Sequence, residues 1–164
     1  MGFDFSFNLE LFIAFLVIYI WILYIYLRIK RRIIDKRLMN SVTSVDRGTK
    51  SERSLILSLL KRGIPEKSIF HDLYVKKSDG KYSQVDLVIA TKEGIIVLEV
   101  KDYTGWIFGR ANQTNWTQSL AYGKRKYRFY NPIKQNTNHI KSLKESLKQF
   151  NNIPFFSVIV FFGD

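Results

Sequence analysis

The chain of 164 residues contains no cysteine and only three prolines. Without thiols it forms no disulfide and no thiolate metal site, which agrees with a cytoplasmic location. Any metal ion must therefore be held by oxygen or imidazole ligands, and carboxylates favour Mg²⁺ or Mn²⁺. Lys and Arg are also absent from the first 27 positions, where Asp4 and Glu10 are the only charged side chains.

Residues 9–27 form an apolar run with one charge, Glu10, near its outer edge. About 20 apolar residues cross a bilayer as a helix, so residues 1–27 are predicted to be a transmembrane anchor in contact with membrane lipid. A basic cluster follows directly: Arg28, Lys30, Arg31 and Arg32. The positive-inside rule then predicts an N-terminus outside the cell membrane and a cytoplasmic remainder. The run is too long and too uniformly apolar for a buried core helix. It is also unlike a cleaved signal peptide, because this segment has no basic residues at its start and no small-residue cleavage site.

Positive charge dominates everything after the anchor. All 26 basic residues follow residue 27, whereas two of the 14 acidic residues precede it. Such a field favours a polyanion as partner. Charge alone does not decide between nucleic acid and the anionic head groups of the inner leaflet.

Patterning divides the rest into a basic juxtamembrane linker, residues 28–45, and one α/β domain, residues 46–164. Apolar periodicity and turn residues predict the order helix, three strands, a small insert, helix, strand. The expected elements are a helix over 45–62, a strand over 68–76, strands over 82–90 and 94–101, short strands around 105–109 and 116, a helix over 133–150 and a strand over 155–162.

The two strands over 82–90 and 94–101 form a predicted hairpin that gathers charge at one point. If Ala90 pairs with Ile95, Asp86 falls opposite Glu99, with Cβ atoms about 5 Å apart. Lys101 lies on the same face as Glu99, two residues away. Neighbouring carboxylates repel each other unless a cation lies between them, so a divalent metal is predicted here. The alternative is a pair of solvated acids with a salt bridge to the lysine, but the apolar surroundings make unpaired charge costly.

Five motifs occur in order along the domain: Gly48-x-x-x-Glu52, Gln84-Val85-Asp86, Glu99-Val100-Lys101, Tyr103-x-Gly105 and Asn131-Pro132-x-x-Gln135-Asn136-x-x-His139. Together with the expected element order, they resemble the NERD (nuclease-related) domain, a branch of the PD-(D/E)XK nuclease superfamily, over about residues 46 to 164. The resemblance implies a restriction-endonuclease-like α/β fold, a mixed central sheet flanked by helices, here preceded by one N-terminal transmembrane helix. It also implies metal-dependent hydrolysis of nucleic-acid phosphodiesters.

The catalytic residues that this resemblance implies are Glu52, Asp86, Glu99, Lys101 and Gln135. Asp86 and Glu99 would bind Mg²⁺ or Mn²⁺ together with the carbonyl oxygen of Val100. Lys101 would position the attacking water and stabilise developing charge. Glu52 would support a second metal or its waters, and the glutamine would position other groups. His139 is expected to be a surface or packing residue.

A basic stretch interleaved with aromatic residues precedes the second helix, and its cations are Lys124, Arg125, Lys126 and Arg128. The pattern suits phosphate contact with base stacking, although a solvated basic loop is the simpler alternative. His71 is assigned no role. The sequence thus predicts a membrane-anchored, metal-dependent nuclease, with DNA favoured over RNA. The alternatives are a non-catalytic scaffold that tethers nucleic acid or a partner at the membrane, and a lipid-binding membrane protein.

Overall fold

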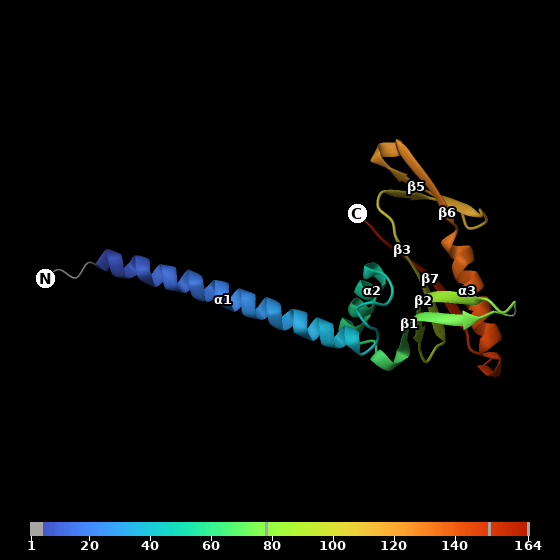
Figure 1. The fold of residues 1–164 in the computed structure, drawn as a ribbon, viewed down its shortest axis with the longest axis horizontal. Coiled ribbons are helices and arrows are strands. Elements are labelled where there is room, and N and C mark those ends of the chain that lie inside the picture. The colour runs from blue at the N-terminus through green and yellow to red at the C-terminus, as the bar shows by residue number, and fades with distance from the viewer. Residues whose placement is uncertain (1–4, 78, 151, 164) are drawn as a thin grey trace. The chain divides into compact units, whose positions relative to one another are not determined.

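The computed structural model describes residues 5–77, 79–150 and 152–163. It divides into two compact units, Met1–Leu38 and Met39–Asp164. Helix α1 (Phe5–Asn40) supplies the first unit, and its last residues belong to the second. The helix continues unbroken through the basic cluster, so the first part of the expected linker is helical (Figure 1).

Helix α1 is long and apolar enough to cross a membrane over Leu9–Asn40, judged by length and composition. Its apolar side chains are exposed, including Phe15 at 68% and Trp21 at 64%. A helix that is hydrophobic on all sides needs an apolar environment around it, such as the interior of a bilayer.

A four-stranded sheet forms the centre of the second unit. Its strands are β1 (Ile69–Lys76), β2 (Tyr82–Ala90), β3 (Ile95–Asp102) and β7 (Phe155–Phe162), in the order β1-β2-β3-β7. The first two pairings are antiparallel and the β3–β7 pairing is parallel. The predicted mixed sheet flanked by helices is therefore confirmed, with helices α2 (Lys50–Lys61) and α3 (Pro132–Ser146) beside it.

Each helix covers one face of the sheet with its own apolar cluster. Ile56 of α2 packs with Leu87 and Leu98, whereas Leu143 of α3 packs with Val97 and other side chains of the opposite face. Strands β2 and β3 are thus buried on both sides, which explains why their sequences are apolar without alternation.

The side-chain alternation of β1 reverses at Asp72. Residues an even number apart normally share one face of a strand. Here Ile69 packs in the α2 cluster, while Leu73 and Val75 pack in the α3 cluster. Asp72 has φ of +55°, and the β1–β2 ladder skips the position at which it would pair with Asp86. The candidate acid of β2 therefore lies where the sheet is locally distorted.

Helix boundaries depend on capping side chains. Helix α2 begins at Lys50 and not near residue 45, because Thr49 caps it: its Oγ1 accepts the N–H of Glu52 and donates to that residue's Oε1. Helix α3 begins at Pro132 behind the N-cap Asn131 and ends at Ser146, earlier than expected.

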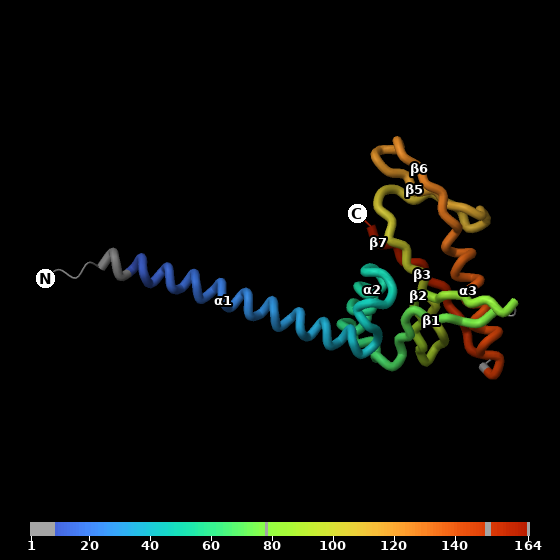
Figure 2. Tube along the Cα trace, in the orientation of Figure 1, coloured from blue at the N-terminus to red at the C-terminus, as the bar shows by residue number. Residues whose placement is uncertain are grey.

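A smaller sheet forms the insert between β3 and α3. It consists of β4 (Trp106–Phe108), β5 (Asn115–Leu120) and β6 (Arg125–Tyr130), in that order. The third strand, β6, was not predicted. Figure 2 shows β5 and β6 beside the end of the domain at which α3 begins. The side-chain amide of Asn131 donates to carbonyls of the β4–β5 loop and so ties the insert to α3.

Candidate catalytic and metal site

The hairpin has the predicted register. Ala90 pairs with Ile95, and the ladder continues to the pair Leu87–Leu98. One step further, Asp86 stands opposite Glu99, but no ladder pair forms there. Instead, Oδ2 of Asp86 accepts the backbone N–H of Val100 at 2.8 Å.

Glu99 is the most deeply buried acidic side chain among the described residues, at 1% exposed. Its Oε1 lies 2.6 Å from Nζ of Lys101, and its Oε2 lies 3.2 Å from Nε2 of His139. Neither contact has hydrogen-bond geometry, so within the described part of the chain both carboxylate oxygens lack a hydrogen-bond partner. A buried carboxylate in this state has free electron pairs for a further ligand.

The pKa of Asp86 reflects its burial and the acidic side chain of Glu99 nearby. Burial, followed by the charge of Glu99, raises the pKa of Asp86 from 3.8 to about 6. This net value already includes the hydrogen bond from the Val100 N–H, which lowers the pKa, a smaller raising effect of the Glu52 charge and a lowering effect of Lys101. The negative charges of Glu99 and Glu52 thus both disfavour ionisation of Asp86, and a bound cation in addition to Lys101 would offset them.

Lys101 is connected to α3 through Gln135. Its Nζ donates to Oε1 of Gln135 at 3.1 Å. Gln135 lies in the first turn of α3, and its position follows from the cap at Asn131. The structure thus brings together two of the predicted catalytic residues that are 34 positions apart in sequence.

Glu52 belongs to α2, and both oxygens of its carboxylate contact a neighbouring side chain. Oε1 accepts the Thr49 hydroxyl at 2.8 Å, and Oε2 lies 2.9 Å from Nε2 of His71. Because an ionised carboxylate only accepts, Nε2 of His71 is the donor. This bond is the main cause of the lowered pKa of Glu52. The other ring nitrogen, Nδ1, lies 2.7 Å from Oγ1 of Thr43.

Gly48 explains the spacing of the first motif. It has φ of +64°, and a Cβ placed on it would collide with Oε2 of Glu52 and the His71 ring. Only glycine combines this backbone conformation with so close an approach to the two side chains.

Both histidines have contacts that the sequence interpretation did not foresee. His139 is buried and lies beside Glu99, with Nδ1 2.7 Å from Oγ of Ser83. It follows Gln135 by four residues on α3, so helical spacing offered a signal that the two share a face. His71 contacts Glu52 from β1, and no local sequence pattern indicates that pairing.

The donor set suits a hard divalent cation. Among the described residues, no three His, Asp or Glu side chains come close enough to hold a metal ion by themselves. The expected set needs only the carboxylates of Asp86 and Glu99 and the carbonyl of Val100. The buried carboxylate of Glu99, whose described contacts are with Lys101 and His139 and lack hydrogen-bond geometry, and the raised pKa of Asp86 fit such oxygen ligation by Mg²⁺ or Mn²⁺.

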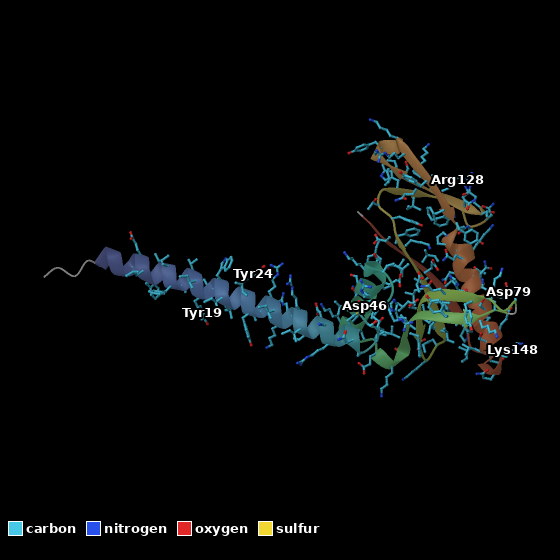
Figure 3. The ribbon with its side chains drawn as sticks, in the orientation of Figure 1. Tyr19, Tyr24, Asp46, Asp79, Arg128 and Lys148 are labelled. Carbon is cyan, nitrogen blue, oxygen red and sulfur yellow. The ribbon has the colours of Figure 1, made fainter. Side chains whose placement is uncertain are left out.

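The predicted nucleic-acid contacts lie on the insert. Lys124, Arg125, Lys126 and Arg128 are all exposed, on β6 or directly before it. Figure 3 shows Arg128 on the small sheet, well separated from Asp79 and Lys148.

Comparisons with known proteins agree with this architecture. The nuclease-related domain (NERD) family matches residues 47–162. An uncharacterised protein of Bacillus anthracis is 32% identical over 93 residues, which cover 57% of this chain and 42% of that protein. The match thus spans less than half the length of that relative. No solved structure gives a significant match to the chain. Since the family match extends over most of the chain, the protein belongs to the nuclease-related domain family.

Proposed function

We propose that the chain is a membrane-anchored, metal-dependent nuclease that hydrolyses phosphodiester bonds in nucleic acid, with DNA as the favoured substrate. The observation that carries this proposal is the buried carboxylate of Glu99, whose oxygens have no hydrogen-bond partner among the described residues. Asp86 stands opposite it and Lys101 beside it. Family membership supports the same reading.

Each group of residues has its own chemical role in this proposal. Asp86, Glu99 and the carbonyl of Val100 would hold Mg²⁺ or Mn²⁺, which supplies Lewis acidity and a bound water of lowered pKa. Lys101, oriented by Gln135, stabilises negative charge that develops on the phosphoryl oxygens. Glu52 adds a fixed negative charge that favours a second cation or its waters.

The membrane helix would place this chemistry at the inner face of the cell membrane. The basic residues that follow position 27 favour the cytoplasmic side, and the N-terminus would then lie outside. A nuclease domain held there would act on nucleic acid that is near the membrane.

The test is a cleavage assay of the purified full-length chain in detergent. Single-stranded DNA, duplex DNA and RNA are incubated with Mg²⁺, Mn²⁺ or EDTA. Cleavage is expected with either metal, none in EDTA, and none by Asp86→Ala. Glu93→Ala is the matched control, because Glu93 is an exposed acid in the turn of the same hairpin.

Two outcomes contradict the proposal. If the wild type binds nucleic acid but cleaves no substrate with either metal, the non-catalytic scaffold replaces the nuclease. If Asp86→Ala cleaves as fast as wild type, the activity comes from elsewhere.

A further inference from the structure

One face of the small sheet carries an ordered pattern of aromatic, small and basic side chains. Pairing aligns two rows across the three strands: Trp106, Ser119 and Lys126 in one, and Phe108, Thr117 and Arg128 in the other. Paired residues point to the same face of a sheet. On this face, β4 thus carries aromatic rings, β5 carries small hydroxyl side chains, and β6 carries cations. We call this surface the β4–β6 face.

On the β4–β6 face, the side chains of the outer strands β4 and β6 are exposed, whereas Ser119 of the central strand is buried. Trp106 is 72% exposed and Phe108 is 53% exposed. On the other face, the Trp116 ring stacks on Phe161 with centroids 6.3 Å apart, and aromatic side chains from β6 and the β3–β4 connection also pack there. Two large rings exposed side by side on one strand are typical of a binding surface.

The charge of the insert selects the kind of partner. From residue 103 to residue 131 the sequence has no Asp or Glu, and its basic residues are Arg110, Lys124, Arg125, Lys126 and Arg128. A pocket of about 390 Å³ opens between Arg110 and Arg128, with Phe108 and Asn115 in its lining. Cations therefore adjoin an exposed ring, a combination that complements a partner with both negative charge and flat apolar groups.

We propose that the β4–β6 face binds single-stranded nucleic acid, with bases stacked on Trp106 and Phe108 and phosphates on Lys126 and Arg128. This inference deepens the proposed function and rests on it for the identity of the polyanion. The ring centroids are 6.1 Å apart and the rings are inclined by 60°. Successive bases of a duplex are parallel and covered by their neighbours, so only an unpaired strand offers faces to two inclined rings.

The insert is also adjacent in sequence to two of the candidate catalytic residues. It leaves the central sheet directly after Lys101 and Asp102, and returns at Asn131, four residues before Gln135. Both ends of the insert are therefore adjacent in sequence to the residues that form the Lys101–Gln135 hydrogen bond. A strand held on the insert would be retained next to the residues proposed to cleave it.

The test measures binding by the full-length chain in nanodiscs of neutral lipid, in EDTA, with fluorescent oligo-dT and a hairpin duplex. Wild type is expected to bind oligo-dT more tightly than duplex. Trp106→Ala and Phe108→Ala should each weaken oligo-dT binding about tenfold, and the double variant more. Tyr127→Ala is the matched control, because Tyr127 is an exposed ring on the opposite face of β6. Trp106→Tyr should restore most of the binding.

Charge variants give an independent measurement. Arg128→Ala should reduce the slope of log affinity against log salt by about 0.7, as expected for one lost phosphate contact to a single strand. Lys92→Ala should leave the slope nearly unchanged, because Lys92 is an exposed cation in the turn between β2 and β3, outside the insert. An unchanged thermal unfolding midpoint verifies that each variant is folded.

Three results would overturn the inference: undiminished oligo-dT binding by the double aromatic variant, equal losses in the Tyr127→Ala control, or preference for duplex. The alternative ligand of the β4–β6 face is an anionic lipid surface. If the double variant loses flotation with phosphatidylglycerol vesicles but keeps oligo-dT binding, the face binds lipid and the inference is wrong. Because EDTA prevents cleavage in every arm, an inactive enzyme would count against the proposed nuclease and leave this result intact.

Discussion

The imidazole of His139 reaches the buried carboxylate of Glu99, with Nε2 3.2 Å from Oε2. Ser83 fixes the ring from the other side, since its hydroxyl lies 2.7 Å from Nδ1. The contact joins α3 to β3, and we propose that it orients one oxygen of the carboxylate assigned as a metal ligand. Groups that orient ligands in this way usually affect metal affinity strongly.

We therefore expect His139→Ala to bind Mn²⁺ about 10- to 100-fold more weakly than wild type, measured by titration calorimetry. His139→Gln should recover part of the affinity, because its side-chain amide can reach toward Glu99. Thr137→Ala, on the exposed side of the same helix, is the control. Equal Mn²⁺ affinity in His139→Ala and wild type would show that the ring does not orient Glu99.

Gly48 should be sensitive to any side chain. In Gly48→Ala, the added Cβ would displace Glu52 and His71 as well as strain a backbone at φ of +64°. Gly63→Ala provides the comparison, because Gly63 also has positive φ but faces open space. Strain alone costs about 1–2 kcal/mol. Denaturant unfolding should show a clearly larger loss for Gly48→Ala, and equal losses would contradict the close packing.

Metal-free stability should depend on pH through Asp86. Its pKa rises from 3.8 in the unfolded chain to about 6 in the folded protein, so the folded state holds the proton more tightly. The associated stability is fully present below about pH 4 and is lost as the pH rises through 6. In EDTA at pH 7.5, Asp86→Asn should therefore be more stable than wild type by about 1–3 kcal/mol.

That advantage of Asp86→Asn should vanish near pH 4, where both side chains are neutral. Added Mn²⁺ should stabilise the wild type and have little effect on the variant, because binding to the folded state raises the unfolding free energy. A wild type that is the more stable protein in EDTA at pH 7.5 would contradict the proposed charge crowding.

Membrane orientation can be measured directly, because the chain contains no native cysteine. In intact cells, a membrane-impermeant maleimide should label Ser6→Cys and not Asn40→Cys. Permeabilised cells should label both, which controls for access to residue 40. Labelling only at residue 40 would reverse the orientation, and release of the protein by high salt alone would rule out a membrane span.

The sequence was most informative where local patterns and chemistry agreed. Strong β-propensity on both sides of a four-residue turn suggested the pairing of Ala90 with Ile95, which the structure confirms and which brings Asp86 opposite Glu99. Strand β7 was predicted over the same residues that the structure assigns, because it is apolar at every position except Ser157. The transmembrane prediction likewise rests on length and apolarity, which α1 retains.

Features that depend on tertiary contacts could not be predicted from the sequence in this way. Strand β6 is rich in basic residues, and the aromatic side chain of Phe129 finds its partner Trp116 only through the pairing with β5. The reversal at Asp72 requires a positive φ in a non-glycine residue, which no local rule predicts. The Glu52–His71 contact joins α2 to β1 across 19 residues, and only the packing of the helix on the sheet brings them together.

The last prediction separates the roles of Lys101 and Gln135. Lys101→Ala removes the ammonium that we propose to stabilise phosphoryl charge, and should slow cleavage about a hundredfold or more at saturating Mg²⁺. Gln135→Ala leaves the ammonium in place but removes its 3.1 Å hydrogen bond, so we expect a smaller loss of about tenfold. Single-turnover rates measure both effects. In the double variant, the loss should be close to that of Lys101→Ala alone, because the glutamine acts through the lysine. Multiplied losses would show that Gln135 acts on the substrate independently, and oligonucleotide binding in EDTA should remain near wild type in all three proteins.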